Sequence, residues 1–190
     1  QQEWFVSTMK QEFEVKVKDL GMGENCEREI VVLNRHIRVC SRGFEHEADV
    51  RHVPLLVDML GLQGANGISA PGVAADARTR EEAEQNKQRG PQDDASLYRQ
   101  IVARANYIAA DRFDLQYAVK EACRAMSSPG EGDWARLKKI GRYCIKYPRV
   151  IHEYLWNYQK ETQVNVYTDS DYAGDRVTRK STSGGAVVIN

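Results

Sequence analysis

The stretch V164-N-V-Y-T-D-S-D-Y-A-G-D175 decides which fold the sequence predicts for the C-terminal part of the chain. From Val164 to Thr168, Val164, Val166 and Thr168 alternate with Asn165 and Tyr167, and such alternation is typical of a β-strand. Strand residues two positions apart point to the same face, so Asp169 and Asp171 would lie side by side if the strand continues. Like charges in this arrangement repel each other, and a cation, a basic neighbour or water must compensate them.

Three explanations of these aspartates are open from the residues alone. Asp169, Asp171, Gly174 and Asp175 match positions 1, 3, 6 and 7 of an EF-hand calcium loop, but Lys180 stands where the bidentate glutamate belongs. A second explanation is a turn in which the aspartates accept hydrogen bonds from their own backbone. A third is a magnesium site for phosphodiester cleavage, for which one strand supplies only part of the ligands.

The composition of the whole chain sets limits on its class. Its 190 residues are 42% hydrophobic and 28% charged, which fits one globular domain or two small ones. The formal net charge is zero, so any nucleic-acid or membrane contact would depend on local patches. No apolar run approaches the roughly 18 residues of a membrane span, and no leader sequence opens the chain. We therefore expect an intracellular protein with no membrane partner.

Cysteine and histidine spacing gives no support for a zinc site or a nucleophilic enzyme. The four cysteines lack C-x-x-C spacing and are too few for a disulfide scaffold, so we expect reduced thiols. H-E-x-x-H, G-x-S-x-G and phosphate-binding glycine loops are all missing from the sequence. The cysteines are Cys26, Cys40, Cys123 and Cys144.

The N-terminal part combines helical and strand patterns. Apolar spacing predicts a helix over residues 4–13, and alternation predicts a strand over 14–21. Residues 28–39 and 44–47 predict one β-hairpin whose turn contains Gly43. The apolar face of this hairpin is expected to comprise Val31, Leu33, Ile37 and Val39.

The middle of the chain predicts helices separated by turns and by one linker. A helix is predicted after Asp49, with Gly61 as its C-terminal cap. Residues 63–96 carry little periodicity and are expected to form a flexible linker, although T79-R-E-E82 has the pattern that caps a short helix. Further helices are predicted over 97–109, 115–126 and 134–144, and strands are predicted after Pro148 and over 186–189.

A basic stripe marks the last of these helices. Lys138, Lys139, Arg142 and Lys146 fall within about 100° of arc opposite the apolar face. No acidic residue occurs from position 134 to position 151. Such a stripe suits a phosphate backbone, which is recognised by charge. A solvated helix face with cations near its C-terminus explains the same pattern and is the more common case.

A longer set of motifs is specific to a family. Y167-T-D-S-D-Y-A-G-D175, followed by T178-R-K-S-T-S-G-G185, resembles the start of the ribonuclease H domain of copia-type LTR retrotransposon polyproteins. Residues 98–114 and 134–143 are similar to the helical stretch that precedes this domain, and residues 13–62 look like the end of the reverse-transcriptase palm and the start of the thumb. The blocks follow the family order, so the resemblance covers nearly the whole chain.

The resemblance implies an α+β fold with an N-terminal helix and β-hairpin, a helical middle and the truncated start of a ribonuclease H-like sheet. Its expected parts are the end of the palm and start of the thumb (1–62), a flexible linker (63–96), a helical thumb or connection region (97–160) and a truncated ribonuclease H-like domain (161–190).

The same resemblance implies an RNA-directed DNA polymerase joined to a nuclease that degrades RNA in RNA–DNA hybrids. Asp169 matches its first catalytic carboxylate, a ligand of Mg²⁺ in the intact enzyme, whereas Asp171 is not assigned to the metal. Arg35, His36 and Arg38 lie in the hairpin where reverse transcriptases hold the primer end. Implied partners are a template-primer or RNA–DNA hybrid and the rest of the polyprotein, in a cytoplasmic particle or the nucleus.

Most of the implied catalytic residues fall outside this sequence. The chain begins at Gln1 rather than at a methionine and stops within the strand-like run A186-V-V-I-N190, so we expect a piece of a longer protein. We also expect that the chain alone catalyses nothing, because one carboxylate cannot hold two metal ions. An alternative is a non-catalytic nucleic-acid-binding remnant of a decayed or repurposed retroelement. Strand edges at residues 187–189 are expected to promote association.

Overall fold

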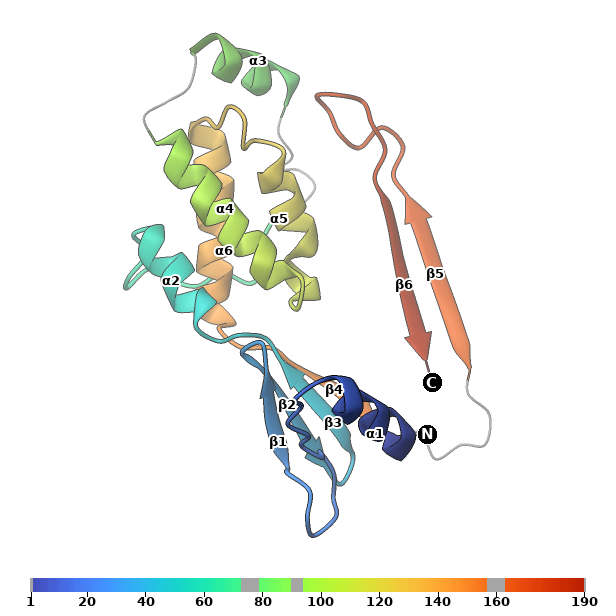
Figure 1. Ribbon diagram of the computed structural model, residues 1–190. Coiled ribbons are helices and arrows are strands. Elements are labelled where there is room, and N and C mark those ends of the chain that lie inside the picture. The colour runs from blue at the N-terminus through green and yellow to red at the C-terminus, as the bar shows by residue number, and fades with distance from the viewer. Residues whose placement is uncertain (1, 73–78, 90–93, 157–162, 190) are drawn as a thin grey trace. The chain divides into compact units, whose positions relative to one another are not determined.

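The computed structural model describes residues 2–72, 79–89, 94–156 and 163–189 (Figure 1). The chain divides into two compact units. Unit 1 comprises Gln1–His46 and Ile151–Trp156, and unit 2 comprises Glu47–Val150 and Asn157–Asn190. Helices and antiparallel sheets occur together, so the predicted α+β class is confirmed. Within the described ranges, no helix has the length and apolar character needed to cross a membrane.

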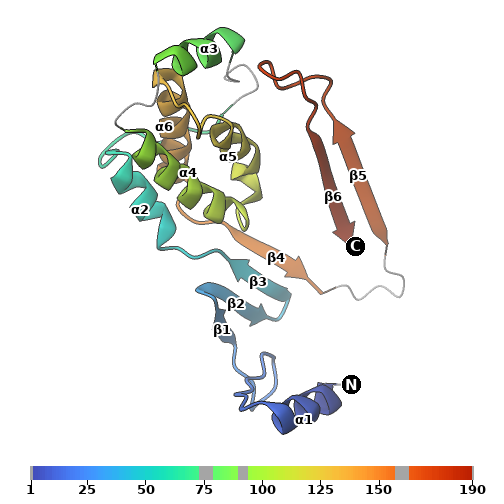
Figure 2. The same ribbon diagram turned by 45° about the horizontal axis from the view of Figure 1, so that its top comes forward.

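Unit 1 contains helix α1 and a four-stranded sheet in the order β1-β2-β3-β4 (Figure 2). The prediction of a strand over residues 14–21 is wrong, because this segment forms only an isolated bridge between Leu20 and Glu27. Alternation alone does not make a strand, whose backbone groups need a partner along their length. The elements are α1 (Gln2–Glu12), β1 (Glu29–Val32), β2 (Arg35–Cys40), β3 (Gly43–Glu47) and β4 (Ile151–Leu155).

A tight turn divides the first arm of the predicted hairpin into two strands, β1 and β2. Leu33 and Asn34 both adopt positive φ, at 50° and 63°, as the two-residue turn of a hairpin requires. The predicted common face is therefore wrong, because the register pairs Val31 with His36 and Ile30 with Ile37. Cross-strand partners share a face, so Val31 lies on the side opposite Ile37.

Unit 2 contains the predicted helices with small changes at their ends. The capping box at T79-R-E-E82 is confirmed: the Glu82 amide donates to the Thr79 hydroxyl at 3.2 Å, and the Thr79 amide donates to the Glu82 carboxylate at 2.9 Å. Gly61 follows α2 with φ of 63°, as its predicted cap role requires. The helices are α2 (His52–Met59), α3 (Arg80–Arg89), α4 (Ala95–Ala109), the 3₁₀-helix η2 (Phe113–Leu115), α5 (Gln116–Cys123) and α6 (Glu131–Lys146).

Helices α2, α4, α5 and α6 enclose the hydrophobic core of unit 2 (Figure 1). Gly141 lets α2 approach α6 closely, since a Cβ at this position would lie 2.6 Å from Cδ1 of Leu60. Complete burial of large aliphatic side chains is the main driving force for this packing. The side chains with 0% exposure include Leu56, Tyr98, Ile101, Val102, Leu115 and Leu137.

The charged side chain of Arg112 is buried in unit 2. Arg112, in the turn between α4 and η2, is only 2% exposed. Its Nε and Nη2 donate to the carboxylate of Asp114 at 2.9 and 2.7 Å, and its Nη1 donates to the carbonyl oxygen of Tyr147 at 3.1 Å. Burial favours a neutral Asp114, but the hydrogen bonds and charge of Arg112 outweigh it and hold the pKa of Asp114 below its ordinary value.

Asp114→Ala is expected to lower the free energy of unfolding of the helical unit by about 3 kcal/mol, because it leaves a buried guanidinium without its counter-ion. Urea denaturation followed by circular dichroism at 222 nm measures the loss. Asp58→Ala removes an exposed carboxylate of α2 and serves as the control, with a change within about 0.5 kcal/mol. Equal losses in the two variants would contradict a special role of the buried pair.

Asp49 provides a pH-dependent contact next to α2. Its carboxylate accepts hydrogen bonds from the side chain of Arg51 at 2.9 and 2.7 Å, and these bonds lower its pKa from 3.8 to about 2. A depressed carboxyl pKa stabilises the fold above the unfolded-state pKa, and the effect is lost as pH falls through the folded-state value. The stability difference between wild type and Asp49→Asn should therefore be full above pH 4 and shrink toward pH 2 in urea titrations. A difference that does not vary with pH would contradict this assignment.

Candidate functional site

The C-terminal hairpin carries the aspartate motif. Strands β5 (Val164–Ser170) and β6 (Ser183–Ile189) pair antiparallel, and Asp169 lies opposite Gly184 (Figure 1). The predicted strands over the aspartate run and over 186–189 are confirmed. Residues 171–182 form the loop between the two strands, and we call this segment the hairpin loop.

Asp169 presents an open carboxylate near the end of β5. Its side chain is exposed, and its Oδ1 accepts a hydrogen bond from the amide of Ser170 at 2.9 Å. Its cross-strand partner, Gly184, has no side chain, and a Cβ there would meet no heavy atom of the described residues within 4 Å. Solvent or a ligand can therefore approach Asp169 from the side of β6.

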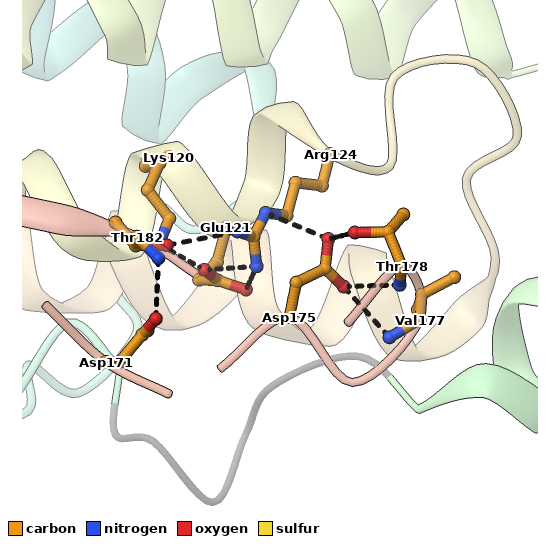
Figure 3. Close-up of polar contacts among 8 residues, drawn as sticks. All are labelled: Lys120, Glu121, Arg124, Asp171, Asp175, Val177, Thr178 and Thr182. Carbon is orange, nitrogen blue, oxygen red and sulfur yellow. Dashed lines mark hydrogen bonds and ion pairs between the residues drawn. The ribbon is translucent and has the colours of Figure 1, made fainter. Parts of the chain in front are cut away.

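Asp171 has a structural role instead (Figure 3). The amide of Thr182 donates to its Oδ1 at 2.5 Å, and the amide of Asp171 donates to the carbonyl oxygen of Thr182 at 3.1 Å. Gly174 makes room for this carboxylate, because a Cβ at position 174 would lie 2.0 Å from Oδ2. Asp171 therefore joins the two ends of the hairpin loop.

Asp175 is the most buried of the three aspartates, with 8% of the whole residue exposed. Its Oδ1 accepts the amides of Val177 and Thr178 at 2.9 and 3.2 Å, and its Oδ2 accepts the Thr178 hydroxyl at 2.6 Å. Burial acts to raise the pKa of Asp175, but these bonds and the charge of Arg124 outweigh it and lower that pKa. Asp175 thus forms a turn in which an aspartate accepts hydrogen bonds from nearby backbone amides, as one of the three explanations of the motif predicted.

The aspartates do not converge on one point. In the part of the chain that the structure describes, no group of three or more His, Cys, Asp or Glu side chains is placed to hold a metal ion. Asp171 and Asp175 bond to separate backbone amides of the hairpin loop. The calcium-loop explanation thus lacks a ligand set among these residues.

The basic stripe on α6 has two different halves. Arg142 donates from Nε to the carbonyl oxygen of Asn66 at 2.8 Å, and Lys146 donates from Nζ to the Ser69 hydroxyl at 2.7 Å. These two cations hold residues 66–69 against the end of α6. Lys138 is exposed and Lys139 is half-buried. Helical periodicity groups the four residues correctly but does not indicate that two of them contact a segment more than 70 positions away.

The residues predicted to bind a primer on β2 do not share one face. His36 and Arg38 lie on the same side as Glu29, whose Oε1 is 2.5 Å from Nδ1 of His36 and 3.2 Å from Nε of Arg38. The hydrogen bond from His36 is the main cause of the lowered pKa of Glu29. Arg35 pairs with Val32 and lies on the other side of the ribbon.

A polar cluster on α5 was not predicted. Lys120 Nζ and Arg124 Nη2 donate to the Thr182 hydroxyl at 3.0 and 3.3 Å, and Arg124 Nε lies 3.7 Å from Oδ2 of Asp175 (Figure 3). Glu121 forms ion pairs with both cations, at 2.8 and 3.0 Å. The spacing of K120-E-A-C-R124 indicates a charged helix face, but the sequence contains no signal for a partner 58 residues away.

Comparisons with known proteins give matches to curated sequences only. No protein-family model and no solved structure matches the chain. An uncharacterized mitochondrial protein of Arabidopsis thaliana is 35% identical over 91 residues, which is 48% of this chain and 37% of that protein. Retrovirus-related Pol polyproteins from the Arabidopsis thaliana transposons RE2 and RE1 are each 33% identical over 96 residues, or 50% of this chain and 6% of each polyprotein.

The chain thus spans a small part of these relatives, about a third of the mitochondrial protein and a much smaller share of each transposon polyprotein. Each match extends over 91 or 96 residues, so the similarity is not confined to one short motif. The comparisons support a relationship between this chain and retrotransposon Pol polyproteins.

Proposed function

We propose that this chain is a segment of a copia-type polymerase and ribonuclease H polyprotein, in which it contacts an RNA–DNA hybrid and supplies the first nuclease carboxylate, Asp169. One observation carries the nuclease part of the proposal. Asp175 is buried in the hairpin loop, and Asp171 bonds to the backbone of Thr182 at the far end of that loop. The exposed carboxylate of Asp169 instead accepts a hydrogen bond from the adjacent Ser170 amide and lies opposite a glycine. A carboxylate that binds a metal must be accessible in this way.

The chemistry of Asp169 suits Mg²⁺. This ion prefers oxygen ligands and is commonly held by one or two carboxylates together with phosphate oxygens. Bound in a nuclease, it activates a water molecule and stabilises charge on the scissile phosphate. Asp169 would hold the ion together with carboxylates from the rest of the nuclease, since the described residues provide no ligand group of three.

Contact with the hybrid is assigned to the basic stripe of α6, which comprises Lys138, Lys139, Arg142 and Lys146. Arg142 and Lys146 add positive charge to the same helix but also fix residues 66–69. The β2 residues contribute less, because the carboxylate of Glu29 forms an ion pair with Arg38 and lies within hydrogen-bond distance of His36. Phosphate contacts of this type provide affinity without sequence preference.

The double variant Lys138→Gln/Lys139→Gln should weaken hybrid binding and reduce the slope of log K against log salt by up to about 1.8, or roughly 0.9 per lost phosphate contact. Fluorescence anisotropy with a labelled RNA–DNA hybrid at several salt concentrations measures both effects. Lys16→Gln/Lys87→Gln removes the same charge from exposed positions outside the stripe and should leave the slope unchanged. Equal effects of the two double variants would refute a specific role of α6.

Asp169→Asn should abolish Mg²⁺-dependent RNA hydrolysis in a polypeptide that joins this chain to the rest of a Pol polyprotein, while hybrid binding stays at the wild-type level. Asp171→Asn is the matched control and should retain hydrolysis, because the amide oxygen of Asn can still accept the hydrogen bond from the Thr182 amide while the carboxylate charge is removed. Release of labelled RNA fragments from the hybrid is the readout. Hydrolysis at the wild-type rate by the Asp169→Asn protein, or by the present chain alone, would count against the proposal.

A further inference from the structure

The hairpin loop is attached to α5 through two of its residues. Thr182 accepts hydrogen bonds from Lys120 Nζ at 3.0 Å and from Arg124 Nη2 at 3.3 Å. Asp175 lies 3.7 Å from Arg124 Nε. Lys120 and Arg124 are four positions apart and therefore project from the same side of the helix. Figure 3 shows both side chains directed at the loop.

Arg124 suits this position because its planar guanidinium has donors in several directions. Its Nη1 donates to Glu121, its Nη2 donates to Thr182 and its Nε faces Asp175. A lysine in its place would offer a single ammonium centre and could not reach all three partners in a fixed geometry. Arg124 therefore connects one residue of its own helix with two residues of the hairpin loop.

The four charges of this network balance one another. Lys120 and Arg124 are positive, and Glu121 and Asp175 are negative. The two acidic side chains are only 13% and 11% exposed, so water screens their interactions less than it would on an open surface. Such a network is stronger than an isolated surface ion pair, which contributes little.

Thr182 links this network to the motif strand. Its hydroxyl binds α5, while its backbone exchanges two hydrogen bonds with Asp171. Asp171 is two residues from Asp169 along the chain. Thr182 therefore connects α5 to the end of β5: its hydroxyl is bonded to Lys120 and Arg124, and its backbone is bonded to Asp171.

We propose that Lys120 and Arg124 are positioning residues, which hold the hairpin loop on α5 through Thr182 and Asp175 and so fix the end of β5 that carries Asp169. The catalytic part of this inference rests on the function proposed above. The attachment itself does not, because it is a property of the folded chain. Two measurements on matched variants separate these parts.

Hydrogen–deuterium exchange of the whole chain tests the attachment. Thr182→Val keeps the branched shape but removes the hydroxyl, and Arg124→Gln removes the guanidinium. Both variants should exchange the amides of the hairpin loop about tenfold faster than wild type, as expected for lost hydrogen bonds to charged groups. Thr182→Ser restores the hydroxyl and should restore protection, and Ser183→Ala, at the exposed neighbouring position, should have no effect.

RNA hydrolysis by the intact polyprotein tests the positioning role. Thr182→Val and Arg124→Gln should lower kcat about tenfold or more with KM for the hybrid unchanged, because misplacement of a reacting group affects chemistry rather than binding. Thermal unfolding of α4, α5 and α6 should remain as in wild type, which separates positioning from general destabilisation.

If the amides of the hairpin loop exchange at the wild-type rate in both variants, the proposal is overturned, regardless of the rate of RNA hydrolysis. Faster exchange with an unaltered kcat would overturn the positioning role. If hydrolysis does not depend on Asp169 at all, the proposed function fails, and the exchange measurement still decides whether α5 holds the loop.

Discussion

The buried guanidinium of Arg112 is the constraint on which the arrangement of unit 2 depends. It joins the corner between α4 and α5, through Asp114, to the end of α6, through the carbonyl of Tyr147. A charge at this depth is tolerated only when its donors are paired, so the corner and the helix end must keep this geometry. Both helices that carry the proposed functional cations, α5 and α6, are oriented by it.

Three aspartates in one short motif have three different roles, and their surroundings explain the difference. Asp171 and Asp175 meet backbone amides and, in the second case, Arg124, so their charges are used to shape the hairpin loop. Asp169 accepts a hydrogen bond from the adjacent Ser170 amide, but its side chain is exposed and lies opposite a glycine, which a ligand can approach. Residue type and spacing identify the motif, but the contacts of each aspartate are needed to tell a structural carboxylate from one that can bind a ligand. The same distinction applies to the basic stripe of α6, where the two C-terminal cations hold a neighbouring segment.

Helices α2, α4, α5 and α6 were predictable because a 3.6-residue period of apolar residues marks the face that they bury in the core, whereas α1 has the same period without any buried residue. The capping box at Thr79 and the glycine after α2 were predictable for a similar reason, since both are local chemistry. Leu33 was missed as a turn residue because a leucine at positive φ is rare, and it lengthened an apparent strand. The contacts of Arg112 with Tyr147 and of Lys120 with Thr182 could not be predicted, because these partners lie 35 and 62 positions apart in the sequence and no periodicity encodes such pairs.

Among the described residues, the contacts between the two-stranded hairpin and α5 lie at the loop end of the hairpin. Val164, Val166, Val187 and Ile189 are 60% to 68% exposed, so little apolar burial supports the strands along their length. A hairpin of two strands is marginally stable without further packing. Its loop end, in contrast, is bonded to α5. From these contacts we expect thermal fluctuation along β5 and β6 to be smaller beside α5 than at Val164 and Ile189. Asp169, two residues from the bonded Asp171, would then lie in the less mobile part of its strand.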